Sequence, residues 1–316
     1  MLSRRDFFRN ATVAAAAAAT GCSGLVGADG IIDTHTHFYD PTRRAGVSWP
    51  PEGDPVLHRP VLPSEYRRMA EPLGVAGTVV VEASPRDEDN EWILDLADRD
   101  PFLLGFIGFL HPGRPGFRQR LEGLALRPKF RGIRVGGWNE GLRPSDPAWI
   151  ADLERVAELG LTVDLLVGPK EMPAVEQLAA RIPRLSFVVD HCANIRMGPP
   201  PHESAWVEGI VACHYRDNVF MKISGLVEGT GRTDGTAPRT LDIYRPVLDT
   251  LWRVFGEDRL MFGSNWPVSS RFAPFGTVLG ILDDYLKPMG QGARRKVLTR
   301  NAARIYGLQP RRSTKP

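Results

Sequence analysis

The stretch GIIDTHTH, residues 30–37, runs directly into FYDPTRR, and this junction separates two classes of α/β fold. The apolar start is typical of a strand that is buried on both faces, because such strands are nearly continuous in Val, Ile, Leu and Phe. An open, doubly wound sheet usually carries a glycine-rich turn after its first strand. No such turn follows residue 37, so a different arrangement of strands and helices is favoured.

Seven further apolar runs alternate with helical patterns along the rest of the chain. They cover residues 77–83, 102–110, 130–137, 161–168, 185–192, 219–225 and 259–265. One helical pattern, SDPAWIADLERVAELG, offers Ser145 as N-cap and Gly160 just past its end. Segments 173–183 and 244–256 behave likewise. Eight strands that alternate with helices predict an α/β fold of the TIM-barrel type, a single (β/α)8 domain over residues 29–316.

Residues 1–28 have the order of an export signal. Arg4 and Arg5 precede two phenylalanines, and an alanine-rich run follows. This order predicts a twin-arginine signal peptide, and therefore export to the periplasm. The run is shorter than the roughly 20 apolar residues that a membrane span needs. Two cleavage sites remain open, one ahead of Cys22, which would leave a lipid anchor, and one after Ala28.

The net charge and the cysteine content indicate which kinds of partner the protein can bind. The formal net charge is +3, and removal of residues 1–28 takes away three arginines and one aspartate, which leaves +1. A charge so close to zero argues against nucleic-acid binding. Cys192 and Cys213 are too few for a disulfide framework and are expected as small buried side chains. The expected partner is a small molecule, with the membrane reached only through an anchor at Cys22.

Polar side chains gather where the predicted strands end. Side chains alternate along a strand, so Asp33, His35 and His37 share one face. His191 ends the sixth predicted strand and Asn265 ends the eighth. In a barrel the carboxyl ends of all strands meet at one mouth, where barrel enzymes place their chemistry. We therefore expect these three histidines and Asn265 to be catalytic, and the histidines to be able to bind zinc at an open site.

Four other side chains are candidates for substrate binding: Arg134, Lys222, Glu82 and Trp266. Arg134 and Lys222 lie in strands that should be buried, where an unpaired charge is costly. Arg134 either pairs with a buried carboxylate, Asp33 or Glu82, or grips a substrate carboxylate, and Lys222 presents the same choice. Glu82 is a hydrogen-bonding wall or a replacement base, and Trp266 could wall an apolar pocket. Together these residues favour an anionic substrate.

The chain resembles the amidohydrolase superfamily, in its branch of lactonases and related hydrolases. The matching segments follow the family's order over almost the whole chain: IIDTHTHFYDPTR, GVSWPP, RGIRV, VVDHCAN, MKISGL, MFGSNWPV and NAARIYGL. The resemblance implies a (β/α)8 barrel that opens a lactone of a sugar- or aromatic-derived acid by attack of water. The NWP segment favours lactonases over the related decarboxylases. A metal-dependent decarboxylase and a catalytically inactive ligand-binding barrel remain the alternatives.

One position departs from the family pattern. The family commonly places an aspartate where this chain has Asn265, and that carboxylate ligates metal or takes a proton from the attacking water. An amide has no charge and no titratable proton near neutral pH. Two states of the site therefore stay open. One is a weakly held divalent ion, with zinc expected, and the other is a metal-free site in which a histidine with a pKa near ~6.5 accepts the proton.

Overall fold

A computed structural model describes residues 30–137 and 141–308. The predicted signal peptide, residues 1–28, lies outside these ranges and stays a prediction. Eight parallel strands follow one another around a single sheet in chain order. They are β1 Ile31–Thr36, β2 Val75–Val81, β3 Leu103–Phe109, β4 Phe130–Gly136, β5 Thr162–Leu166, β6 Phe187–Val189, β7 Val219–Ile223 and β8 Leu260–Phe262. Each predicted strand is confirmed to within a few residues, except that β6 and β8 end early.

The sheet closes on itself between its first and last strands. The backbone N–H of Asn265 donates to the backbone carbonyl of His35 at 2.8 Å, and the backbone N–H of His37 donates to the backbone carbonyl of Trp266 at 2.9 Å. These bonds join the end of β1 to the segment that follows β8. The predicted (β/α)8 barrel is therefore confirmed as one domain, and three of the residues expected to be catalytic, His35, His37 and Asn265, lie at the closing seam.

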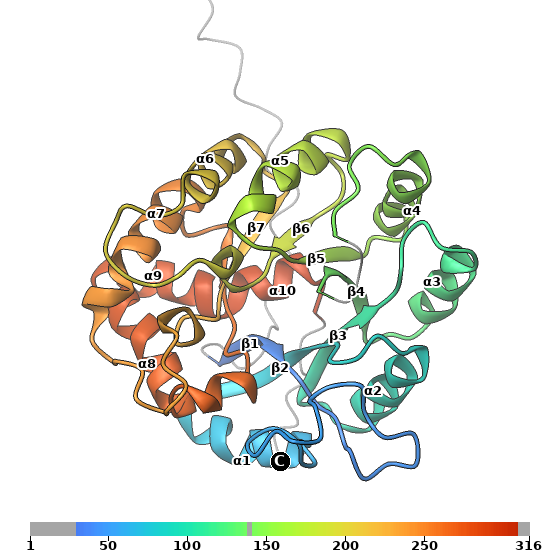
Figure 1. Cartoon of the computed structure of the whole chain (residues 1–316), viewed down its shortest axis with the longest axis horizontal. Helices are drawn as coiled ribbons and strands as arrows, with labels where there is room; N and C mark the ends of the chain where they lie inside the picture. The colour runs from blue at the N-terminus through green and yellow to red at the C-terminus, as the bar shows by residue number, and fades with distance from the viewer. Residues whose placement is uncertain (1–29, 138–140, 309–316) are drawn as a thin grey trace, which may run out of the picture.

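Helices surround the barrel, as the view along its axis shows (Figure 1). No helix of the described residues is long and apolar enough to cross a bilayer. Helix α4 begins at Pro147 with Asp146 as its N-cap, because the Asp146 carboxylate accepts from the amides of the first turn. The expected cap, Ser145, lies one residue too early. The helices are α1 Pro63–Ala70, α2 Asp87–Arg99, α3 Phe117–Ala125, α4 Pro147–Glu158, α5 Met172–Arg181, α6 Ser204–Ala212, α7 Arg245–Phe255, α8 Phe275–Leu286, α9 Gly290–Arg295 and α10 Asn301–Ile305.

The apolar core has two parts. The larger part fills the layer between the strands and the surrounding helices. The smaller part lies inside the barrel, where strand residues such as Ile32 and Met261 pack against Tyr306 and Leu308 from the C-terminal segment. Figure 1 shows α10 crossing the centre of the ring of strands. This segment plugs the N-terminal end of the barrel, so the chemistry is left to the opposite mouth.

Candidate active site

Two left-handed turns place side chains at the mouth. Strand β6 ends at Val189, and residues 191–194 then have φ values between 51° and 57°; Asn265 after β8 has φ 57°. Such values are uncommon outside glycine and persist only where surrounding contacts enforce them. Trp206 Nε1, for example, donates to the carbonyl of Cys192 at 2.9 Å. His191 and Asn265 therefore lie just beyond the strands, in turned backbone, and not on the strand ends that we expected.

A glycine allows His191 to take this place. Gly225 follows β7 with φ +64°, and a Cβ built on it would lie 2.7 Å from the Cβ of His191. Both the left-handed backbone and the close approach exclude a larger residue. Ser224 supplies the matching polar contact, because its Oγ lies 2.9 Å from His191 Nδ1 and accepts from the His191 amide at 3.1 Å. The turn after β7 thus fixes the position of His191.

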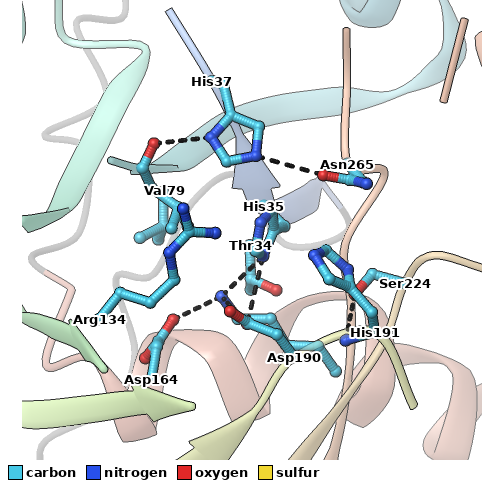
Figure 2. A network of polar contacts seen from close by, with 12 residues as sticks. Thr34, His35, His37, Val79, Arg134, Asp164, Asp190, His191, Ser224 and Asn265 are labelled. Carbon is cyan, nitrogen blue, oxygen red and sulfur yellow. Dashed lines mark hydrogen bonds and ion pairs between the residues drawn. The ribbon is translucent and has the colours of Figure 1, made fainter. Parts of the chain in front are cut away.

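Three histidines converge at the mouth, as predicted (Figure 2). The ring centroid of His35 lies 5.0 Å from that of His37 and 4.3 Å from that of His191. Burial lowers the pKa of His37 to about 3 and that of His191 to about 4, and it holds the pKa of His35 well below its usual value. All three imidazoles are neutral near pH 7. The expectation that one of them titrates near 6.5 is therefore wrong.

A buried ion-pair network lies beneath the histidines. The ammonium of Lys222 is 2.6 Å from Asp164 Oδ2, 3.1 Å from Asp190 Oδ1 and 3.2 Å from His35 Nδ1. The Tyr306 hydroxyl of the C-terminal plug donates to Asp164 at 3.0 Å. Neither Asp164 nor Asp190 was singled out from the sequence, although each lies in a predicted strand. This network joins the histidine layer to the floor of the barrel.

The network assigns Lys222 a role different from the expected one. Its side chain is fully buried, with 0% exposure. Burial raises the pKa of Asp164 to about 6 although Lys222 opposes the shift. Burial would also raise the pKa of Asp190, but Lys222 and His35 outweigh it and hold that pKa well below normal. Lys222 therefore balances two carboxyl groups inside the barrel and does not face a substrate.

Arg134 and Glu82 form a second buried ion pair. Arg134 Nε donates to Glu82 Oε1 at 2.7 Å, and its Nη2 donates to the Glu82 carbonyl at 2.9 Å. The other carboxylate oxygen of Glu82 accepts from the amide of Ser84 at 2.9 Å. Of the two carboxylates that the sequence offered to Arg134, the structure selects Glu82. Asp33 instead accepts from the Tyr66 hydroxyl at 2.6 Å.

Trp266 is a packing residue in this structure. Its side chain is 3% exposed, and its ring centroid lies 6.0 Å from that of Phe38 and 5.3 Å from that of Tyr66. Because so little of its surface is exposed, the Trp266 side chain is not placed to contact a substrate as we had expected. Trp49 is better placed for such a role, because it is only partly buried and its ring centroid lies 6.1 Å from that of His37.

Asn265 links His37 to a carboxylate that the sequence analysis missed. Asn265 Oδ1 lies 3.2 Å from His37 Nε2, and its Nδ2 donates to Glu228 Oε1 at 2.9 Å. Burial raises the pKa of Glu228 to about 7. Glu228 lies in the long segment after β7, where no periodic pattern fixes which side chains point to the mouth. The site thus contains a carboxyl group next to the position that lacks its aspartate.

A divalent cation fits the residues present. His35, Asp190 and His191 offer ligand atoms within 4.8 Å of one another. The buried Nε2 of His35 has no hydrogen-bond partner in the described parts of the chain. If His35 carries its proton on Nδ1 and donates it to Asp190, 3.2 Å away, Nε2 is free to ligate. His37, the other expected ligand, is not in this group, since its ring nitrogens face Val81 and Asn265.

Comparisons with known proteins agree with this architecture. The amidohydrolase family model matches residues 32–308. An L-fucono-1,5-lactonase of Burkholderia ambifaria is 32% identical over 287 residues, which cover 88% of this chain and 95% of that protein. A 4-sulfomuconolactone hydrolase of Rhizobium radiobacter is 24% identical, covering 88% and 90%. A crystal structure of an amidohydrolase from Burkholderia multivorans with bound zinc superposes with a TM-score of 0.77 at 23% identity, covering 89% of this chain and 100% of that one. The chain therefore belongs to the amidohydrolase family.

Proposed function

We propose that this protein is a lactonase, a hydrolase that opens a small cyclic ester by attack of water at the C-terminal mouth of the barrel. The observation that carries the proposal is the cluster of three buried, neutral histidines at that mouth. It occurs in a chain that is 32% identical to an L-fucono-1,5-lactonase over most of its length. The names of two relatives, that lactonase and the 4-sulfomuconolactone hydrolase, both describe lactone opening.

The chain's own residues can hold the attacking water. Neutral imidazole nitrogens accept hydrogen bonds, and those of His35, His37 and His191 are kept neutral by burial. With pKa values of about 3 and 4, His37 and His191 are weak bases near pH 7. They are therefore better suited to orienting a water molecule by accepting its hydrogen bonds than to removing its proton. A divalent ion held by His35, His191 and Asp190 would supply Lewis-acid activation of water. Zinc binding, measured by equilibrium dialysis, should weaken in His35→Ala whether or not the protein is active.

The charges at the mouth favour a neutral lactone. Arg134 and Lys222, which we expected to hold an anionic substrate, are paired with Glu82 and with Asp164 and Asp190. A substrate carboxylate would have to compete with these buried pairs, and breaking one of them is strongly unfavourable. A sugar-derived lactone, which carries hydroxyl groups and no charge, avoids that competition. We therefore place sugar-derived lactones ahead of the carboxylated, muconolactone-like ones.

A substrate screen tests the proposal. Purified protein without residues 1–28 would be given neutral aldonolactones and carboxylated muconolactones, with and without chelator, and hydrolysis followed by acid release. We expect turnover of at least one aldonolactone. Asn265 favours a second candidate, a catalytically inactive barrel that binds lactones, which would shift the melting temperature without turnover. Release of carbon dioxide from an aromatic acid would instead support a decarboxylase.

We also infer export through the twin-arginine route, on the basis of the residues SRRDFF near the N-terminus. Changing Arg4 and Arg5 together to Lys should leave the precursor in the cytoplasm, and a normally exported variant would contradict the inference. Cys22→Ala distinguishes the two cleavage sites. A lipid-anchored protein would leave the membrane fraction in that variant, whereas a protein cleaved after Ala28 would be unaffected.

A further inference from the structure

A chain of polar contacts leads from the barrel wall to a partly open cavity. The carbonyl of Val81 lies 2.9 Å from His37 Nδ1, His37 Nε2 lies 3.2 Å from Asn265 Oδ1, and Asn265 Nδ2 lies 2.9 Å from Glu228 Oε1. The second oxygen of Glu228 is buried and has no hydrogen-bond partner within residues 30–137 and 141–308. Glu228 also lines a cavity of about 190 Å³ between the turns that follow β6 and β7.

The donors and acceptors of this chain are coupled. A carbonyl only accepts, so His37 Nδ1 carries a proton and donates it to Val81. Neutral His37 then has a lone pair on Nε2. That lone pair faces the amide of Asn265, whose oxygen and nitrogen are distinguished by their partners alone. The orientation of Asn265 is therefore decided at its other end, by Glu228.

Glu228 has two states, and each selects one orientation of the amide. As a carboxylate it accepts from Asn265 Nδ2, at 2.9 Å, and turns Oδ1 toward His37. As a carboxylic acid it donates to Oδ1, and Nδ2 then turns to His37 and donates to Nε2. We propose that Glu228 is a positioning residue whose ionised form opens a water site between His37 and Asn265 and whose protonated form closes it.

The open state explains how a water molecule is held without an aspartate at position 265. Two acceptors, His37 Nε2 and Asn265 Oδ1, then lie 3.2 Å apart with no proton between them. A water molecule that donates one proton to each relieves this repulsion and directs its lone pairs away from both. In the closed state Asn265 Nδ2 donates a hydrogen bond to the lone pair of His37 Nε2, so this nitrogen can no longer accept a proton from the water.

The surroundings of Glu228 suit a switch near neutral pH. Burial raises its pKa to about 7, while the Asn265 contact opposes the shift. The titratable neighbours in the described segments are Cys192, from the turn after β6, and Tyr244, ahead of α7, and burial keeps both neutral by raising their pKa values to about 12. Arg196 lines the same cavity. Glu228 is thus the group of this cavity that changes charge between pH 6 and 8.

The kinetic test is Glu228→Gln, because glutamine imitates the closed state by donating its amide to Asn265 Oδ1. Wild-type kcat should rise with pH through a midpoint near the Glu228 pKa of about 7. In the variant kcat should fall about a hundredfold with little change in KM, and the midpoint near pH 7 should disappear. Glu65→Gln is the matched control, since the Glu65 side chain is 40% exposed and paired with Arg59, away from this cavity. A Glu228→Gln enzyme with the wild-type rate and pH profile would overturn the proposal.

A second measurement does not depend on turnover, whereas the kinetic test rests on the proposed lactonase activity. Infrared difference spectra of wild type against Glu228→Gln, recorded from pH 5 to 9, should show a protonated carboxyl band that disappears near pH 7 and belongs to Glu228. If no such band titrates there, the switch does not exist. If it titrates while no lactone is hydrolysed, Glu228 behaves as proposed and the lactonase assignment alone fails.

Discussion

Replacement of Lys222 by methionine should destabilise the barrel more than any surface change of charge. Lys222 is fully buried, and its ammonium is 2.6 Å from Asp164 and 3.1 Å from Asp190. Methionine fills a similar volume but leaves two buried carboxyl groups without their cation. Removal of one partner of a buried ion pair costs about 3–5 kcal/mol.

Proton uptake limits the expected loss. The pKa of Asp164 is already about 6, one unit below pH 7, so protonating this carboxylate at pH 7 costs only roughly 1.4 kcal/mol. The variant can therefore neutralise Asp164 at little cost, but Asp190, buried beside His35, loses the cation that holds its pKa low. We expect a decrease of about 3–5 kcal/mol in the free energy of unfolding, and a drop of about 10 °C in melting temperature.

Urea unfolding followed by tryptophan fluorescence measures this loss. The matched control is Lys287→Met, because Lys287 is 65% exposed and pairs with Asp284 on the surface. Such a pair contributes at most about 1 kcal/mol. The double variant Lys222→Met/Asp164→Asn should be more stable than Lys222→Met alone, because it removes one of the uncompensated carboxyl groups. A free energy of unfolding for Lys222→Met within about 1 kcal/mol of the wild-type value, which is the size of the effect expected for the control, would refute the reasoning.

Three further outcomes follow from the site. Gly225→Ala should displace His191 and lower kcat by about a hundredfold or more, while circular dichroism stays native; an unchanged kcat would separate the turn from catalysis. Arg134→Met should lower stability by about 3–5 kcal/mol and leave KM for a neutral lactone little changed, because Arg134 pairs with Glu82; a large rise in KM would make it a substrate contact. The raised pKa of Glu228, about 7, favours the folded state below pH 4.5, and this stability is lost as pH rises through 7. Wild type should therefore lose about 3 kcal/mol relative to Glu228→Gln over that range, measured by urea unfolding at several pH values.

The barrel could be predicted from the sequence because its strands are buried on both faces. Such strands need nearly continuous apolar residues. The run at 102–110, for example, contains the whole of β3, and the run at 77–83 contains all but the first two residues of β2. The ends of β6 and β8 could not be predicted in the same way. The left-handed backbone at residues 191–194 and at Asn265 depends on tertiary contacts, and no local sequence pattern predicts it.

The sequence predicted that the three histidines would converge, and the structure brings them together, but it did not predict the buried acids beside them. An unpaired charge in a buried strand is energetically unfavourable, and this predicts a partner for Lys222. The same argument applies to Asp164, which lies in the apolar run 161–168. Pairing the two would have identified the network beneath His35. Glu228 is different, because it lies in a glycine-rich segment without periodicity, and only the fold brings it to 2.9 Å from Asn265.

The identity of residue 265 and the presence of Glu228 constrain each other. Two carboxylates at hydrogen-bond distance cannot both be ionised in a buried site, since like charges raise the pKa of one of them strongly. An aspartate at 265 would therefore have to share a proton with Glu228, whose pKa burial has already raised to about 7. The amide removes this conflict, because it donates to Glu228 from Nδ2 and presents Oδ1 to His37 at the same time. A carboxylate set back behind a neutral amide can thus control the water site while its charge stays out of contact with the histidines. On this argument Asn265 is one half of a two-residue arrangement, and Asn265→Asp alone would disturb the site without restoring the arrangement common in the family.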